Sequence, residues 1–596
     1  MTAVPKDLRC GSVLGRRYEE RKVLRDASQR CAKRNGFFTG SRIAALLEFI
    51  VSAMEGGEQH EQVRNGRMRV LFTGTPLSRK DCIASRHAST TQVSTALPRK
   101  SPKPTRQGPG FQSEVTMTTF KNLRFGFASA EMESAEDPDL LRDGYYEFRN
   151  AISEAIDGSR FLFLGYKGSG KSAIAEKLKL TASTRYDLFV TSMFLSDFPF
   201  TSFKKIVSGD AEPEARYPTA WSWILLLTLI DSFTKDEGGS FVGDFDCMRP
   251  IKELRSMGFL PTPSLKELVT VSSKRSFKTG IPKILEAGSE TTQCELDLSL
   301  FRLVAYLKRL VQTFNTRSRH VLVIDGLDDI LTARDVQYQS LAALVLEVAR
   351  LNHDFGQNSI RAKIILLCRT DLFERLPGAN KNKVRQDSAV QLDWYHNPRD
   401  PGTSELVRLA NLRASLTDES IQNVISSFFP PTILDQSTTN FLLDLTRHTP
   451  RDFLQLLTHI QKFSSGGKLK REDILAGVRA YSIDYFLPEL KDELVGYVSH
   501  NVVDSVFEAI GALAKRDFVL RELQQQIEHH KGFSDEQLEV ALRALFECSA
   551  IGNIQHRPGN KGATFFSFKY RNRNSHLNMR QQMILHRGVW KAMNLI

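Results

Sequence analysis

Eight consecutive residues match the pattern G-x-x-x-x-G-K-S, which binds nucleotide phosphates when it lies between a strand and a helix. Its glycines let the backbone bend and approach an anion without a Cβ in the way. The lysine carries a charge to the β- and γ-phosphates, and the serine hydroxyl is a ligand for Mg²⁺. The sequence therefore predicts a phosphate-binding loop, formed by Gly165, Tyr166, Lys167, Gly168, Ser169, Gly170, Lys171 and Ser172.

An acidic element is expected beside such a loop. Four apolar residues, 321–324, precede Asp325 and predict a buried strand with this carboxylate at its carboxyl end, where ligands of open parallel sheets bind. We expect Asp325 to hold Mg²⁺ together with Ser172. Asp328 and Asp329 follow in the next turn, near enough to deprotonate an attacking water. We favour Asp329 as this base, and the alternative is that both carboxylates cap the next helix.

The elements that position these residues alternate between strands and helices. Five apolar runs are too short for helices and predict buried strands. They cover residues 161–164, 188–194, 320–324, 363–368 and 389–392. Helical periodicity between them predicts an α/β P-loop fold, a parallel sheet flanked by helices. Residues 140–157, just before the first strand, predict one amphipathic helix.

The pattern divides the chain into four parts. Residues 1–116 are rich in Ser, Thr, Arg and Pro and predict a disordered basic tail. Residues 117–400 predict the P-loop domain, with a largely helical insertion over about 197–316 that accounts for the long separation of its motifs. Helical periodicity continues alone over 401–498, which we interpret as a lid. Residues 499–596 predict three helices and a hairpin, the pattern of a winged helix.

The formal net charge of +13 is unevenly distributed. Residues 1–116 hold 21 Lys+Arg against 10 Asp+Glu, a net of +11, which leaves 60 against 58 for the rest. The change of texture also makes Met117 an alternative start of the functional protein. At the other end, residues 548–596 hold eight Lys and Arg and no acid. That end is suited to DNA phosphate, and a protein partner is the alternative.

Composition argues against several other classes of protein. The longest apolar run, near residues 221–230, is about half of the roughly 20 residues that span a bilayer. Because the start lacks a secretory signal, we expect a cytoplasmic protein with no membrane contact. The seven cysteines are scattered and never form C-x-x-C, so they are expected to be free thiols. Neither H-E-x-x-H nor G-x-S-x-G occurs, so no second catalytic centre is indicated.

The phosphate loop and the DGLDD form of the acidic motif together resemble the STAND and AAA+ classes of P-loop ATPases, in particular uncharacterised bacterial members. The resemblance runs from about residue 125 to the C-terminus. It implies ATP and Mg²⁺ as cofactors and ATP hydrolysis as the activity. The guanine-reading N-K-x-D pattern is missing, because Lys383 stands where Asp is required. Gly326 replaces the acid usual in AAA+ proteins, which favours the STAND-like form and leaves the base open between Asp328 and Asp329.

The resemblance also implies roles for three arginines. Arg369 follows the predicted strand 363–368, where such proteins carry a polar sensor. Arg385 lies before the strand 389–392, where an arginine often reaches the γ-phosphate of a neighbouring subunit in a homo-oligomer. Arg451 opens a lid helix after a small turn, as a sensor arginine does. A plain salt bridge is the alternative for each.

Two interpretations of the purpose stay open. In the first, ATP closes the lid over the sheet and the C-terminal domain reports this state to a protein partner. In the second, the chain acts on DNA through that domain, in a layout similar to archaeal replication initiators. A small-molecule kinase is a third and less favoured class, because such enzymes seldom need a lid and a winged domain.

Overall fold

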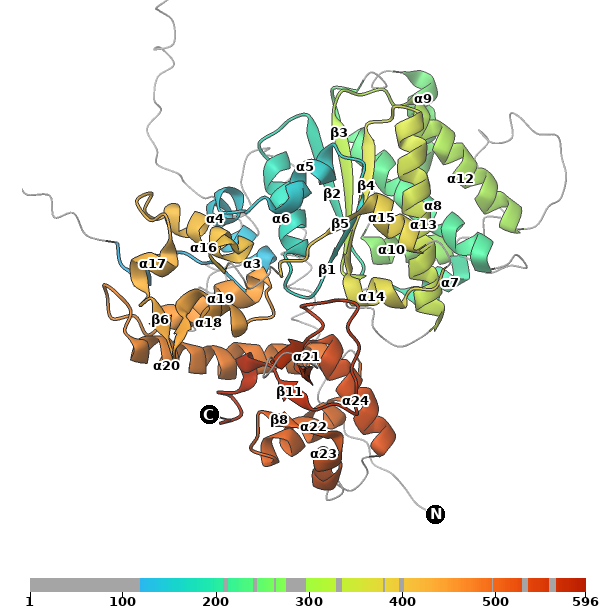
Figure 1. The fold of residues 1–596 in the computed structure, drawn as a ribbon. Helices are drawn as coiled ribbons and strands as arrows, with labels where there is room; N and C mark the ends of the chain where they lie inside the picture. Colours follow the sequence, from blue (N-terminus) through green and yellow to red (C-terminus); the bar gives the residue numbers. More distant parts are fainter. Residues whose placement is uncertain are drawn as a thin grey trace, which may run out of the picture. The chain divides into compact units, whose positions relative to one another are not determined.

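A computed structural model describes residues 118–196, 198–206, 213–239, 244–261, 264–274, 296–327, 335–378, 381–395, 401–495, 497–527, 534–556 and 564–595. The predicted tail, residues 1–116, lies outside them. A five-stranded sheet is formed by β1 (Leu162–Gly165), β2 (Leu188–Phe194), β3 (Arg319–Asp325), β4 (Ala362–Arg369) and β5 (Ala389–Gln391). Its order is β2-β3-β4-β1-β5, and every neighbouring pair is parallel (Figure 1). The predicted α/β fold class is confirmed.

Both faces of the sheet are covered, which explains why its strands are continuous apolar runs. In β3, Val321 and Val323 pack in one core with α5 (Ala151–Ile156) and α6 (Lys171–Ala182). Leu322 and Ile324 point into a second core with α8 (Pro213–Thr234) and α13 (Asp335–Gln357). Successive side chains of a strand point to opposite faces, so each core receives alternate residues.

The single helix predicted over residues 140–157 is wrong. The segment forms α4 (Pro138–Asp143), the 3-10 turn η2 (Phe148–Asn150) and α5. Gly144 follows α4 directly, and Arg149 and Asn150 have φ values of 53° and 56°, which no helix continues through. The chain therefore turns before it enters β1.

Helices occupy the described part of the segment between β2 and β3. They are α7 (Phe200–Ile206), α8, α9 (Phe245–Ser256), α10 (Leu265–Lys274) and α12 (Leu296–Thr313). The indole N–H of Trp221 in α8 donates to the carbonyl of Ser340 in α13 at 2.9 Å. Most of this region thus belongs to the layer that covers one face of the sheet.

The segment after β4 leads into the lid. It begins with α14 (Thr370–Arg375) and α15 (Lys381–Ser388) before β5. The lid contains α16 (Glu405–Ser415), α17 (Val424–Phe428), a small hairpin of β6 (Thr432–Ile433) and β7 (Gln436–Ser437), α18 (Thr438–Asp444), α19 (Pro450–Gln461) and α20 (Arg471–Tyr481). A π-helical turn, Ser482–Phe486, joins α20 to α21 (Leu487–Val495).

The start of the described chain packs against the lid. The amide of Gln461 donates to the carbonyls of Phe120 and Leu123, at 2.9 and 2.6 Å. Glu133, in α3 (Ala130–Glu136), forms a buried ion pair with Arg413 of α16, with Nη2 to Oε1 at 2.6 Å. This N-terminal segment is therefore fixed to both the P-loop domain and the lid.

The described residues of the C-terminal region form three α-helices and a four-stranded sheet. The helices are α22 (His500–Ala512), α23 (Leu520–Ile527) and α24 (Asp535–Glu547). The strands β8 (Asp517–Phe518), β9 (Ile551–His556), β10 (Thr564–Ser567) and β11 (Met583–Leu585) form an antiparallel sheet of order β10-β9-β11-β8. Within the described residues, no helix combines the length and apolar character that a membrane-spanning segment requires.

Candidate functional site

The predicted phosphate loop joins β1 to α6. Gly168 and Gly170 have φ values of +80° and +95°, a conformation that glycine adopts without strain. A Cβ on Gly165 would lie 2.1 Å from Ser169 Oγ. The indole of Trp394 donates to the carbonyl of Ser169 at 3.0 Å and supports the loop from behind. The backbone can therefore fold around an anion at the start of α6, where a helix favours negative charge.

Lys171 and Ser172 lie at the first turn of α6. Lys171 is buried, and its Nζ donates to the carbonyls of Gly165 and Tyr166 at 3.3 and 3.2 Å. The hydroxyl of Ser172 donates to Oδ2 of Asp325 at 3.0 Å. Asp325, at the end of β3, accepts the N–H of Gly326 through its other oxygen at 2.8 Å. The structure thus brings Ser172 and Asp325 together across 153 positions of the chain.

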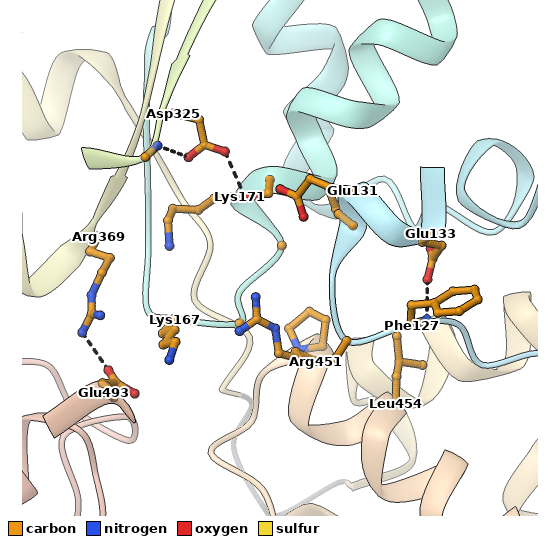
Figure 2. A pocket seen from close by; sticks show the side chains of 18 of the residues that line it. Phe127, Glu131, Glu133, Lys167, Lys171, Asp325, Arg369, Arg451, Leu454 and Glu493 are labelled. Atoms are coloured by element: carbon orange, nitrogen blue, oxygen red, sulfur yellow. Dashed lines mark hydrogen bonds and ion pairs between the residues drawn. The ribbon is translucent and has the colours of Figure 1, made fainter. Parts of the chain in front are cut away.

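A cavity of about 550 Å³ opens in front of these residues (Figure 2). Five of the eight loop residues line it: Lys167, Gly168, Gly170, Lys171 and Ser172. Gly165, Tyr166 and Ser169 support the loop without lining the cavity. Its other walls come from the N-terminal segment, the start of α19, the end of β4 and helix α21.

The lid contributes Arg451 to the cavity. Thr449 caps α19 by accepting the N–H of Asp452, and Pro450 occupies the first helical position. The backbone N–H of Arg451 donates to the carbonyl of Gly168 at 3.3 Å. Its guanidinium donates to Glu489 of α21 at 3.0 Å. Arg451 therefore lies next to the phosphate loop, and its guanidinium is paired with the carboxylate of Glu489.

Arg369 ends β4 and also lines the cavity. Its guanidinium donates to both oxygens of Asp371 at 2.9 Å and to Glu493 at 2.7 Å. Burial lowers the pKa of Arg369, but the charges of these two carboxylates outweigh it and hold that pKa well above its ordinary value. For Asp371 the two effects have opposite signs. Burial raises its pKa, but the charge of Arg369 outweighs burial and lowers that pKa to about 2. In this conformation Arg369 is a buried salt-bridge partner.

Among the described residues, the predicted Arg385 does not line the cavity. Arg385, in α15, pairs with Glu374, and its guanidinium lies 5.4 Å from the centre of the Phe373 ring. Asp328 and Asp329 lie outside the described residues, which stop at Leu327 and resume at Asp335. Their assignment as candidates for the base stays a prediction.

No sequence motif predicted the wall that the N-terminal segment forms. Phe127 and Ala128 line the cavity, as does Leu454 of α19, and Figure 2 shows Phe127 close to Leu454. The N–H of Phe127 donates to Glu133 at 3.1 Å, and Arg413 holds this carboxylate. The Phe127 ring is 44% exposed. In the structure, this exposed aromatic ring beside the phosphate loop marks the segment as part of the site.

Three cations of residues 548–596 pair with carboxylates that lie outside this segment. Arg571 and Arg587 lie 3.5 and 3.7 Å from the carboxylate of Asp444 in the lid. Lys569 pairs with Glu547 of α24 at 3.1 Å. The sequence-based view of eight uncompensated cations is therefore wrong for these three. Arg557 and Lys561 lie outside the described residues.

The C-terminal region also touches the turn that carries Arg451. His448, in this turn, stacks on Tyr570 with ring centres 5.4 Å apart and contacts Tyr395 at 5.0 Å. Burial, together with the charge of Arg571, lowers the pKa of His448 to about 3, so the ring is neutral at physiological pH. The turn before α19 is thus in contact with the phosphate loop and with the C-terminal region.

Comparisons with known proteins give one family match, limited to the lid. Residues 404–487 match the FunZ-associated C-terminal helical domain. No curated protein matches the chain. Among solved structures, the chain is similar to Cdc6p from Pyrobaculum aerophilum, at 12% identity over 74% of this chain and 92% of that one, with a TM-score of 0.28. Drosophila ORC bound to DNA is similar at 13% identity over 74% and 94%, with a TM-score of 0.24. At such TM-scores neither likeness supports an argument about fold or function.

Proposed function

We propose that the chain binds ATP with Mg²⁺ in this cavity, hydrolyses it, and acts as a nucleotide-driven switch. The observation that carries the proposal is the contact of Ser172 with Asp325 at 3.0 Å, one residue beyond the buried Lys171. A phosphate loop supplies the anion site, and the strand-end carboxylate supplies the acidic group that nucleotide hydrolysis needs beside it.

Ser172 and Asp325 have the donors that Mg²⁺ prefers, because a hydroxyl and a carboxylate both offer hard oxygen atoms. When bound, the ion would neutralise charge on the β- and γ-phosphates. Lys171 adds a fixed positive charge at the same end of the cavity. The loop N–H groups and Lys171 thereby orient the phosphates toward the end of β3.

The opposite wall suits a base. The Phe127 ring and the Leu454 side chain present apolar surface to the cavity (Figure 2), and flat aromatic rings stack on such surface. Because the Glu133–Arg413 pair connects this wall to the lid, a base bound here would contact two parts of the chain at once. That arrangement lets nucleotide occupancy set the position of the lid.

Binding of ATP and release of phosphate by the full chain test the proposal. We expect ATP to bind with a Kd in the micromolar range, to be preferred over GTP, and to be hydrolysed only when Mg²⁺ is present. Calorimetry measures the binding and a phosphate-release assay measures the turnover. Turnover that persists after Mg²⁺ is removed with a chelator would contradict the role given to Ser172 and Asp325.

DNA is the alternative partner, and the salt dependence of DNA binding separates it from a protein partner. Among the eight C-terminal cations, Arg573, Arg580 and Lys591 form no ion pair within the described residues, whereas Lys569, Arg571 and Arg587 do. With Arg557 and Lys561, at most five stay available for phosphate. For a chain from which the basic tail, residues 1–116, is deleted, we expect weak binding of duplex DNA, with log K falling against log salt by a slope no steeper than about −4.5.

Fluorescence anisotropy with a labelled duplex measures this slope. Asp444→Asn, which releases Arg571 and Arg587, is expected to steepen it by about two. A slope near −7 for the same shortened chain, the value for all eight cations, would mean that the C-terminal region leaves the lid to bind DNA. The switch would then act on nucleic acid.

A further inference from the structure

Helix α21 directs two buried carboxylates at the cations of the cavity. Glu489 and Glu493 lie four residues apart, so they share one face of the helix. Their side chains are 16% and 5% exposed. Neither residue belongs to the phosphate loop or to the acidic motif, because both lie in α21.

One oxygen of Glu489 pairs with two cations. Its Oε1 accepts from Lys167 of the phosphate loop at 3.1 Å and from Arg451 of the lid at 3.0 Å. Burial raises the pKa of Glu489, but the charges of Lys167 and Arg451 outweigh it and hold that pKa below its ordinary value. The carboxylate is therefore ionised and links the loop, the lid and α21.

Glu493 forms a second link of the same kind. Its Oε1 accepts from Arg369 at the end of β4 and its Oε2 from Arg447 of the lid, both at 2.7 Å. Figure 2 shows Arg369 and Glu493 joined at the edge of the cavity. Arg447 also pairs with Asp452, so it keeps a partner when Glu493 moves.

Three of these cations, Lys167, Arg369 and Arg451, line the cavity with Lys171. A triphosphate brings several negative oxygens into this space, and such oxygens form charge-assisted hydrogen bonds with the same ammonium and guanidinium groups. In the structure, the carboxylates of α21 already accept hydrogen bonds from these three cations. Phosphate and α21 therefore compete for the same positive charges.

Movement of α21 would reach the C-terminal region directly. The helix continues from α20 through the π-helical turn, and it precedes α22. Lys491 of α21 pairs with Asp504 of α22 at 2.8 Å. Ser482, in the π-helical turn, accepts the N–H of Ala592 at 2.9 Å. In Figure 1, α21 leads from the lid helices into the C-terminal region.

We propose that Glu489 and Glu493 are displaceable counter-ions, so that the phosphates of ATP take Lys167 and Arg451 from Glu489 and Arg369 from Glu493, and release α21. This inference rests on the proposed ATP binding and deepens it, because it identifies the helix that senses the phosphates. α21 is then the element through which the occupied cavity changes the C-terminal region.

The first test needs no nucleotide. We compare hydrogen exchange of α21 amides in the full chain carrying Glu489→Gln with that in a control, Asp484→Asn, which removes an exposed carboxylate one turn earlier. Glu489→Gln is expected to speed exchange in α21 by about threefold or more, because the ionic link to the loop and lid is weakened. The control is expected to leave it unchanged. Equal exchange in both variants would overturn the proposal.

The second test uses ATP itself. Glu489→Gln is expected to bind ATP about tenfold more tightly than the unaltered chain, because one charge-assisted hydrogen bond no longer competes. In the unaltered chain, ATP should protect the phosphate loop from exchange and expose α21. Protection of both would overturn the displacement. If ATP protects neither, the proposed function fails, and the nucleotide-free comparison still decides whether Glu489 restrains α21.

Discussion

Lys171→Ala is expected to raise the Kd for ATP about 100-fold or more. The Lys171 ammonium is buried and fixed on two loop carbonyls, so its charge is held in place before the nucleotide arrives. Its hydrogen bonds to two phosphates are of the charge-assisted kind, worth about 1.5 to 3 kcal/mol each. Loss of about 2.7 kcal/mol corresponds to a factor of 100 in affinity. Calorimetric titration with ATP measures the change.

Lys179→Ala is the matched control for this experiment. Lys179 lies on the same helix two turns later, does not line the cavity, and pairs with the buried carboxylate of Glu176. Its removal should leave ATP affinity within about twofold. Unchanged affinity in Lys171→Ala would remove the claim that this loop binds phosphate, whatever the control does.

Asp329→Asn is expected to lower the turnover number by about 10²- to 10⁴-fold while the Kd for ATP stays within about threefold. Asparagine preserves the shape of the side chain but cannot accept a proton from water. The motif begins at Gly326, whose φ of +76° turns the chain sharply after Asp325. Single-turnover phosphate release, measured beside equilibrium binding, separates the two quantities.

Asp328→Asn completes the comparison. If this variant loses turnover and Asp329→Asn does not, the base is Asp328 and our assignment is wrong. If both turn over normally, neither carboxylate deprotonates the water. Retained binding with lost turnover in Asp329→Asn alone supports the assignment.

The sheet was predictable from the sequence because burial on both faces produces apolar runs that are too short for a helix. β2 begins and ends at the predicted residues, and the other strands differ by one residue at one or both ends. The helix over residues 140–157 was wrong because its apolar spacing is helical, whereas Gly144 and the positive φ of Asn150 interrupt it. Periodicity describes which residues are buried, and it misses a turn between two short helices.

The site was predictable where each residue belongs to a recognisable local motif, as for Ser172 and Asp325, which meet across 153 positions of the chain. The phosphate loop and the turn before Arg451 are local patterns, and the structure places both at one cavity. Glu493, a partner of Arg369, lies 124 positions away, so no local pattern reveals that a carboxylate from α21 holds this arginine. Asp444 likewise comes from the lid, which is why the C-terminal segment alone suggested uncompensated charge.

The N-terminal segment is synthesised long before the residues that it contacts. Phe120 is held by Gln461, 341 positions later, and Glu133 by Arg413, 280 positions later. A ribosome adds about 5 to 20 residues per second, so the segment is made many seconds before its partners. A nascent chain that ends before residue 413 thus carries a phosphate loop without a complete pocket. Under the proposed function, ATP would meet its full set of contacts only after the lid has left the ribosome.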